Sequence, residues 1–279
     1  MKYIRKYTLE SDWEDDQQDR EANVPVTSWL VDVDEVRYDH EEEPTIPLVL
    51  TSESNPKVFT ILDEAGFGHE DPDGYTAAEL GEITDADFYS STLDSVNNTV
   101  YYSIFYDSDI ETFDEFRYFT GITEIKHLAF TGCTDLSSII LPNSITAISG
   151  RNEHNVTIGG ITYGTSVLSP FYNTDLSTLT IPNSVTSIGD HAFYECSGLT
   201  SVTIGNSVTS IVLNAFVSCT GLENITSLAT TAPSIDYLTF YNIKTGGTLH
   251  VPSGSDYSTW MQNSNYYLGK YNWAIAYDA

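Results

Sequence analysis

The feature that most constrains this chain of 279 residues is a repeat of 23 residues in its second half. Residues 181–188 read IPNSVTSI, and residues 204–211 repeat them as IGNSVTSI. The pair Ala192-Phe193 returns as Ala215-Phe216 at the same offset. One unit of this length cannot bury its own apolar positions, whereas stacked units align them in continuous internal columns. The repeat therefore predicts a solenoid.

Within each unit, segments such as residues 201–204 (SVTI) favour one strand per turn, and these strands are expected to stack in parallel. Cys133, Cys196 and Cys219 occupy one column of the repeat. Packing in the core is enough to explain why cysteine recurs at one position of the repeat. We therefore expect buried structural thiols that neither bind metal nor catalyse a reaction.

The repeat resembles the BspA-like leucine-rich repeats of bacterial surface antigens, because residues 181–199 match the consensus IPxSVTSIGxxAFxxCxxL. The resemblance covers roughly residues 112–260 and implies a right-handed solenoid with a parallel strand face, used for adhesion and protein binding. The family has no catalytic motif. The expected fold class is α+β, mainly β: this solenoid with a helical N-terminal cap and a small N-terminal β/α attachment module.

Charge and composition divide the chain into three expected regions. Residues 1–45 form an attachment module with an acidic linker, residues 46–120 a helical cap, and residues 121–279 the solenoid with a C-terminal cap. The net charge of −29 makes nucleic acid a poor partner, because phosphates would be repelled. No apolar run reaches the roughly 18–20 residues of a membrane helix, so membrane insertion is not expected.

An insertion at residues 150–167 interrupts the repeat and has the pattern of a hairpin with a Gly159-Gly160 turn. Its candidate binding residues are Asn155, Ile158 and Tyr163. Two interpretations are equally compatible with the sequence: a recognition element, or a tolerated insertion without a partner.

Helix-start patterns occupy the region before the repeats. Asn55-Pro56 predicts a helix that ends near Gly66, with Asn55 as its cap. Residues 76–79 and 112–115 are capping-box patterns that each predict a short helix. The aromatic residues of the second helix are expected to seal the open end of the first repeat: Phe113, Phe116, Tyr118 and Phe119.

The segment at residues 71–79 resembles the EF-hand-type or dockerin-like loop that often precedes BspA-like repeats. Its candidate calcium ligands are Asp71, Asp73 and Glu79. Two departures weaken the pattern, since His69 stands at position 1 and the glutamate comes one residue early. The alternative is a turn that keeps its shape without an ion, and no other cofactor is expected.

Residues 1–45 combine a basic strand, an acidic helix and the segments VPVTSWLV and EVRY. This order resembles the N-terminal modules of virion proteins in tailed phages of gut bacteria, which dock a fibre or decoration protein onto the particle. The resemblance implies attachment through Tyr3, Tyr7, Trp29 and Tyr38. The basic start is not followed by the apolar block of a signal peptide, so we expect assembly in the host cytoplasm and a place on the virion.

Catalytic patterns are absent from the sequence: it has no Walker-type glycine loop and no Gly-x-Ser-x-Gly elbow. The histidines lack zinc-ligand spacing, and we expect His127 and His191 to be solvent-exposed, because they fall near outward repeat positions. Tyrosine clusters at 101–102, 266–267 and Tyr257/Trp260 suit either capping or an interaction surface. An enzyme, such as a glycan hydrolase, is the least favoured hypothesis.

Together these patterns predict a non-enzymatic structural and binding protein of a phage virion, as a head fibre, decoration or tail-associated component. Residues 1–45 would dock to other virion proteins, and the solenoid would present an adhesion surface to a host protein or glycan. A homo-oligomer is expected, because fibres assemble symmetrically. The alternative is a cellular BspA-like surface adhesin lacking its leader.

Overall fold

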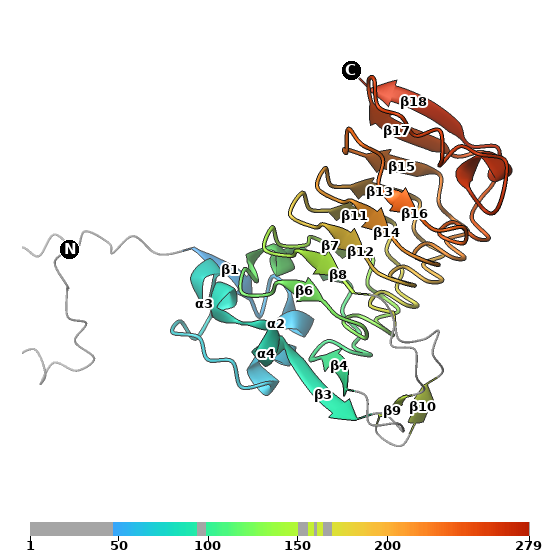
Figure 1. Cartoon of the computed structure of the whole chain (residues 1–279). Coiled ribbons are helices and arrows are strands. Elements are labelled where there is room, and N and C mark those ends of the chain that lie inside the picture. Colours follow the sequence, from blue (N-terminus) through green and yellow to red (C-terminus); the bar gives the residue numbers. More distant parts are fainter. Residues whose placement is uncertain (1–46, 94–98, 150–155, 159–160, 164–168, 279) are drawn as a thin grey trace, which may run out of the picture. The chain divides into compact units, whose positions relative to one another are not determined.

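The computed structural model describes residues 47–93, 99–149, 156–158, 161–163 and 169–278 (Figure 1). These residues belong to one compact unit, residues 47–279. The attachment residues Tyr3, Tyr7, Trp29 and Tyr38 lie outside the described residues. Among the helices of the described ranges, none combines the length and the apolar character that a membrane span requires.

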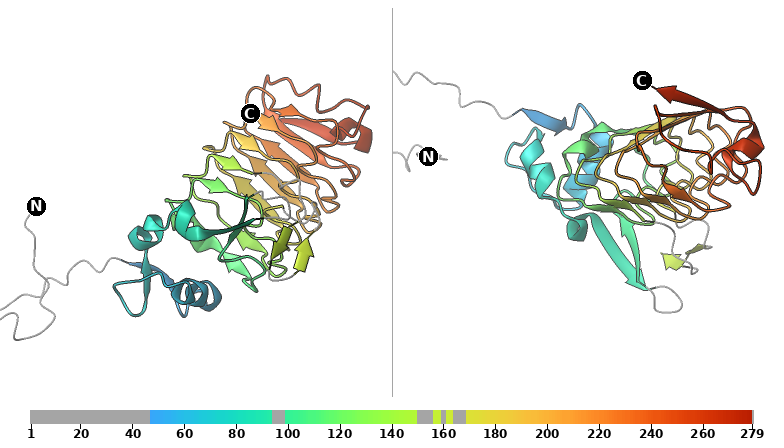
Figure 2. Two further views of the ribbon diagram at one scale, coloured as in Figure 1. Left: turned by 60° about the horizontal axis from the view of Figure 1, so that its bottom comes forward. Right: turned by 45° about the horizontal axis from the view of Figure 1, so that its top comes forward.

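One long parallel sheet runs along the solenoid, with one strand from each successive turn (Figures 1 and 2). Its pairing is in register with the repeat, so Val202 lies opposite Leu179 on one side and Ile225 on the other. Alternate side chains point into the core, as period-2 alternation predicts. In spatial order its strands are β11 (Thr178–Ile181), β13 (Ser201–Ile204), β15 (Asn224–Ser227), β17 (Thr248–Pro252) and β18 (Ala274–Asp278).

A second parallel sheet is built from two-residue strands, so the prediction of one strand per turn was wrong. A pair of residues is too short for the alternation that identifies strands in a sequence. Hydroxyl groups support the stack, since Thr209 Oγ1 donates to the Thr186 carbonyl at 3.2 Å. The strands are β6 (Glu124–Ile125), β8 (Ala147–Ile148), β12 (Ser187–Ile188), β14 (Ser210–Ile211) and β16 (Ser234–Ile235).

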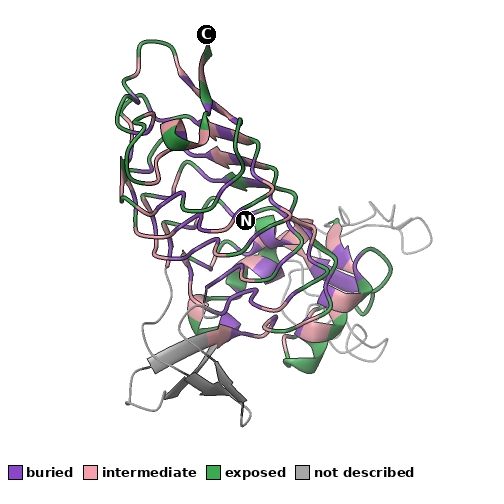
Figure 3. Ribbon diagram, turned by 90° about the vertical axis from the view of Figure 1, so that its right-hand side faces the viewer, coloured by how far each residue is buried: buried purple, intermediate pink, exposed green. Residues whose placement is uncertain are grey.

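A ladder of stacked aromatic rings forms the centre of the core, as the repeat predicts. Phe193 lies 5.3 Å from Phe171 and 5.0 Å from Phe216 between ring centroids, with interplanar angles of 12° and 16°. The ladder begins at Phe130 and continues through Phe240 to Trp260. All of these side chains are fully buried, and Figure 3 marks the buried residues along the turns.

The cysteine column is buried, as expected. Cys196 Sγ donates to the Phe171 carbonyl at 3.1 Å, and Cys219 Sγ donates to the Phe193 carbonyl at 3.1 Å. Each of these two thiols thus donates a hydrogen bond to a backbone carbonyl of the preceding turn. Burial raises the pKa of Cys196 to about 12 and keeps its thiol protonated.

Helices precede the solenoid, and two of their starts are as predicted. Asn55 caps α2 (Pro56–Glu64), and Thr76 with Glu79 forms the capping box of α3 (Ala77–Glu82). A further capping box at Thr84 starts α4 (Asp85–Phe88), which the sequence analysis did not predict.

The capping box expected at Thr112 is wrong. Thr112 and Phe113 form strand β5 (Thr112–Phe113), which pairs in parallel with β7 (Ser138–Ile139). The following 3-10 helix, η1 (Asp114–Tyr118), has no side-chain cap. Pairing with the first repeat thus determines the conformation of Thr112. The other described elements are β1 (Leu48–Thr51), β2 (Gly74–Thr76), β3 (Tyr89–Leu93), β4 (Thr99–Ser103), β9 (Val156–Ile158), β10 (Ile161–Tyr163) and η3 (Leu268–Tyr271).

Candidate functional site

The loop proposed for calcium uses its carboxylates to hold its own backbone. Glu79 Oε1 accepts from the Glu70 N–H at 2.7 Å, and Oε2 accepts from the N–H of Thr76 at 2.7 Å and from its hydroxyl at 2.9 Å. Burial raises the pKa of Glu79, but these hydrogen bonds outweigh it and hold the pKa below its usual value. Asp71 Oδ1 accepts from the Asp73 N–H at 2.9 Å.

The described ranges contain no group of three or more His, Cys, Asp or Glu residues placed to hold a metal ion. His69, at the first ligand position, packs against the ring of Tyr75 at 4.7 Å and that of Phe59 at 5.5 Å. Calcium binding by Asp71, Asp73 and Glu79 therefore remains a prediction, and binding would require rearranging existing hydrogen bonds.

A cavity of about 230 Å³ lies beside this loop, lined in part by Phe67, Tyr75, Glu79 and Asp87. Asp87 Oδ2 accepts from the N–H and the hydroxyl of Thr84 at 2.9 and 2.6 Å, so this carboxylate also belongs to a helix start. Hydrogen bonds to the backbone and to the capping threonines thus hold the carboxylates of Glu79 and Asp87 in place at the starts of α3 and α4.

The predicted hairpin is present in the backbone. Strands β9 and β10 pair antiparallel, with Ile158 opposite Ile161. Asn155 and the glycine turn lie outside the described residues, and only the backbone of Ile158 and Tyr163 is described. Its role as a recognition element stays a prediction.

Tyrosines follow the phenylalanine ladder on the outside of the solenoid. The residue after the ladder position is Tyr172, Tyr194 or Tyr241, and Tyr266 packs against the last of these. We call these four residues the tyrosine column. Tyr172 and Tyr194 are half-buried and stack at 5.9 Å with an interplanar angle of 18°. Tyr241 is 43% exposed and meets Tyr266 edge-on at 4.7 Å.

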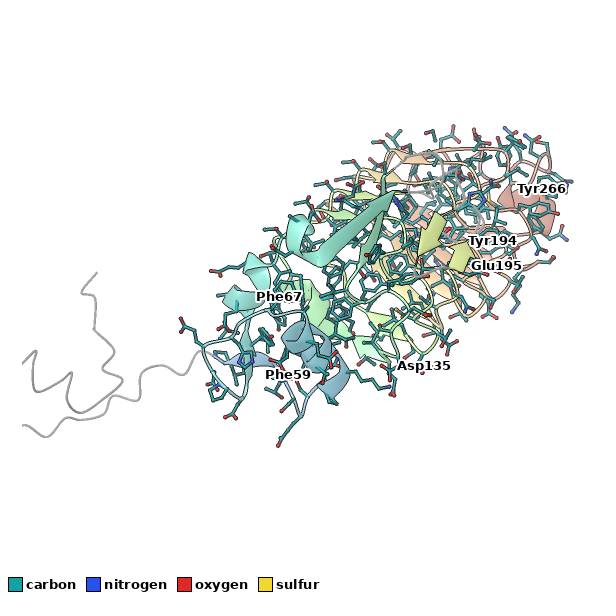
Figure 4. The ribbon with its side chains drawn as sticks, turned by 90° about the horizontal axis from the view of Figure 1, so that it is seen from below. Phe59, Phe67, Asp135, Tyr194, Glu195 and Tyr266 are labelled. Atoms are coloured by element: carbon teal, nitrogen blue, oxygen red, sulfur yellow. The ribbon has the colours of Figure 1, made fainter. Side chains whose placement is uncertain are left out.

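Backbone geometry fixes the tyrosine column. The residues after Tyr172, Tyr194 and Tyr241 have a left-handed conformation, with φ of 57° at Glu195, and so does Ser218 (φ of 60°) after Val217, which takes the same place in its own turn. The N–H of Glu195 donates to the Val217 carbonyl at 3.0 Å, and that of Ser218 donates to the Tyr241 carbonyl at 2.9 Å. These bonds connect one turn to the next directly beneath the column. In Figure 4, Tyr194, Glu195 and Tyr266 lie along one long side of the solenoid.

Sequence reasoning missed this column, although the signal was present. Phe-Tyr pairs recur at residues 171–172, 193–194 and 240–241, in phase with the repeat. The groups named from the sequence were instead aromatic residues close together in the chain, at 101–102, 266–267 and Tyr257/Trp260. Of those groups, Tyr257 and Trp260 are fully buried, so they serve as packing at the end of the ladder. The Trp260 indole N–H donates to the Pro233 carbonyl at 2.9 Å.

The expectation of solvent-exposed histidines was wrong. His191 is only 5% exposed and is hydrogen-bonded to Asp190, in a left-handed turn that precedes Phe193. His127 is half-buried, and its burial, assisted by the charge of Lys126, lowers its pKa to about 4. Both residues lie in turns that lead back into the core, so a variable repeat position need not be an exposed one.

A match to a family model agrees with the repeat architecture. The family model of the BspA type leucine rich repeat region matches in 6 copies, over residues 78–169 and 168–264. A leucine rich repeat protein of T. pallidum, of known structure, is 19% identical with a TM-score of 0.34; the match covers 61% of this chain and 86% of that chain. No curated protein matches the chain.

Two further solved structures are similar over about half of their own length. A leucine rich cell surface protein from Faecalibacterium prausnitzii is 18% identical, with a TM-score of 0.25 and coverage of 57% of this chain and 58% of that chain. A leucine-rich repeat protein from Bacteroides ovatus is 19% identical, with a TM-score of 0.24 and coverage of 58% and 50%.

Proposed function

Because the chain belongs to the family of BspA-type leucine-rich repeat proteins, we propose that it is a non-enzymatic binding protein whose solenoid presents a contact surface to another molecule. The ring ladder from Phe130 to Trp260 carries this proposal. Because the turns stack on this rigid core, equivalent outward side chains recur once per turn at fixed places. Side chains that are already held in place lose little conformational entropy when they bind a partner.

The segment before the repeats is proposed to cap the solenoid. The rings of Phe116 and Phe88 lie 5.5 and 6.2 Å from Phe130, the first ring of the ladder. Phe116 is fully buried, as are Phe113 and Phe119. Without these rings the first turn would expose its apolar interior to water, which terminal repeats must avoid.

Residues 1–45 are proposed to attach the chain to a phage particle as part of a homo-oligomer. The support is their resemblance to virion docking modules, in the strand pattern around Tyr3, Tyr7, Trp29 and Tyr38. Partners on the particle would be other virion proteins, and the solenoid would face the host. Family membership favours a second candidate, a cellular surface adhesin, because BspA-like repeats are used for adhesion in bacterial surface antigens.

Deleting residues 1–45 tests the docking role. In a phage that carries the gene, we expect the shortened chain to be missing from purified particles. The compact unit of residues 47–279 should keep its circular dichroism and melting temperature. A matched variant, Tyr241→Ala, should be incorporated normally. Normal incorporation of the shortened chain would contradict docking, and protease-accessible full-length chain on uninfected cells would favour the cellular adhesin.

A further inference from the structure

Strand β18 ends the long parallel sheet, and we propose that it pairs antiparallel with the β18 of a second copy to form a symmetric dimer. It is the last strand in the spatial order of this sheet, and within the described residues no other strand pairs with its outer edge (Figure 1). This contact deepens the proposed homo-oligomer by naming a surface, and it does not depend on docking through residues 1–45.

The free hydrogen-bonding groups of β18 belong to Ile275 and Tyr277. Along a strand, successive residues turn their N–H and C=O groups to opposite edges. The Ala274 N–H donates to the Gly247 carbonyl, and the Asp278 carbonyl accepts from the residue that follows β17, both at 2.9 Å. Alternate residues from 274 to 278 therefore face β17. The N–H and C=O groups of Ile275 and Tyr277 lie along the outer edge of the sheet.

The opposite end of the solenoid closes its strand edge with a side chain. Glu111 and Phe113 turn their carbonyls towards the neighbouring turn, so the Thr112 carbonyl of β5 faces away from it. Asn55 Nδ2, at the start of α2, donates to that carbonyl at 2.9 Å. The N-terminal cap thus occupies the position that the strand of another copy would need. Head-to-tail addition of copies is blocked, and a symmetric contact between two β18 edges remains.

The composition of β18 also favours pairing. Edge strands that stay unpaired commonly carry a lysine, a proline or a bulge. The sequence of β18 is AIAYD, without lysine or proline, and its register with β17 is unbroken. Tyr277 is 57% exposed, although Val251, its neighbour on β17, is buried. Tyr277 thus extends the apolar inner face of the sheet beyond the core, where a second copy can cover it.

One antiparallel register uses every free group of the two edges. With Ala276 on the twofold axis, Ile275 lies opposite the partner's Tyr277, and Tyr277 lies opposite the partner's Ile275. Residues with outward groups then face each other, and each of these pairs exchanges two hydrogen bonds. The same register places a β-branched side chain beside an aromatic one, which is a favourable cross-strand pair.

Charge determines how the contact responds to salt. In this register Asp278 lies opposite the partner's Ala274, so the two Asp278 carboxylates do not face each other. Asp278 is 3.4 Å from His250 of its own chain. The net charge of −29 on each copy opposes association, so added salt should strengthen the dimer by screening this repulsion.

Disulfide cross-linking of the full chain tests the register. Ala276 is opposite its own copy in a pair without hydrogen bonds, where Cα atoms are about 4.5 Å apart. Disulfides join Cα atoms separated by about 4.4–6.8 Å, so Ala276→Cys should give a covalent dimer under mild oxidation. Ala274→Cys is the matched control on the same face of β18, because its copies would be roughly 13 Å apart and should stay unlinked. The native cysteines are buried in the core.

Sedimentation of the full chain at high salt tests the edge itself. Tyr277→Pro removes an outward N–H but none of the hydrogen bonds to β17, and edge strands tolerate such a proline. This variant should have half the solution mass of the wild-type chain. Tyr237→Ala, which removes another exposed ring away from β18, should leave the mass unchanged. Unchanged melting temperatures would show that the variants are folded.

The β18 contact is refuted if both cysteine variants cross-link equally, or if Tyr277→Pro keeps the wild-type mass. A chain that is still oligomeric in that case would keep the proposed homo-oligomer through another surface, whereas a monomeric wild-type chain would overturn both. A dimer that forms only after deletion of residues 1–45 would show that this segment covers the edge in the full chain, and would also refute the contact.

Discussion

Phe193 provides a quantitative test of the stacked core. Its ring is fully buried between Phe171 and Phe216, at 5.3 and 5.0 Å. Replacing it with alanine removes both contacts and leaves a cavity in the middle of the ladder. Such a substitution costs about 3–5 kcal/mol of unfolding free energy, of which each lost ring pair contributes about 0.5–1.5 kcal/mol.

Urea unfolding measures this cost. Circular dichroism reports on all turns. Once Trp13 and Trp29, the other two tryptophans of the chain, are replaced by phenylalanine, the fluorescence of Trp260 and Trp273 reports on the C-terminal end. Because repeats contact only their neighbours, a break at Phe193 should separate the two transitions, with the N-terminal turns no longer coupled to the C-terminal ones. Tyr237→Ala removes a ring that is 51% exposed and should cost less than about 1 kcal/mol. A Phe193→Ala loss no larger than that of this control would refute the stacked core.

Three further predictions concern titration and metal. The unfolded thiols lose their protons near pH 9, while burial raises the pKa of Cys133 to about 11 and that of Cys196 to about 12. Unfolding free energy should therefore fall as pH rises from 9 towards 11, and Cys196→Ala should flatten this fall in urea titrations. The effect of pH through His127 has the opposite sign to that through the thiols. The imidazole binds a proton near pH 6.5 in the unfolded chain and only near pH 4 in the folded one. Stability should thus decrease as pH falls through this window, less so in His127→Leu. Calcium at millimolar concentration should leave the melting temperature unchanged, because three donors already occupy the Glu79 carboxylate; a rise of several degrees that Glu79→Gln abolishes would contradict this.

The inward positions were predictable from sequence because packing makes them repeat. Phe193 and Phe216 recur at the period of the turn, and stacking is what requires that period. The two-residue strands were not predictable, since Ser187-Ile188 pairs with its neighbours through the stack and has no alternation of its own. Thr112 is a second case in which a distant contact decides the local structure. Its sequence pattern predicts a helix cap, but it pairs with Ser138 as part of a strand.

The candidate site was less predictable than the core, for a physical reason. The positions that follow the ladder are less constrained by packing than the ladder itself, so they vary between turns, as from the half-buried Tyr194 to the buried Val217. Their contacts join residues of different turns: Tyr172 meets Tyr194 at 22 residues' separation, and Tyr241 meets Tyr266 at 25. A sequence shows such contacts only after the turns are superposed on the phenylalanine ladder. The ladder thus has two roles, because the same backbone bonds that keep each ring buried also set the spacing of the tyrosines outside.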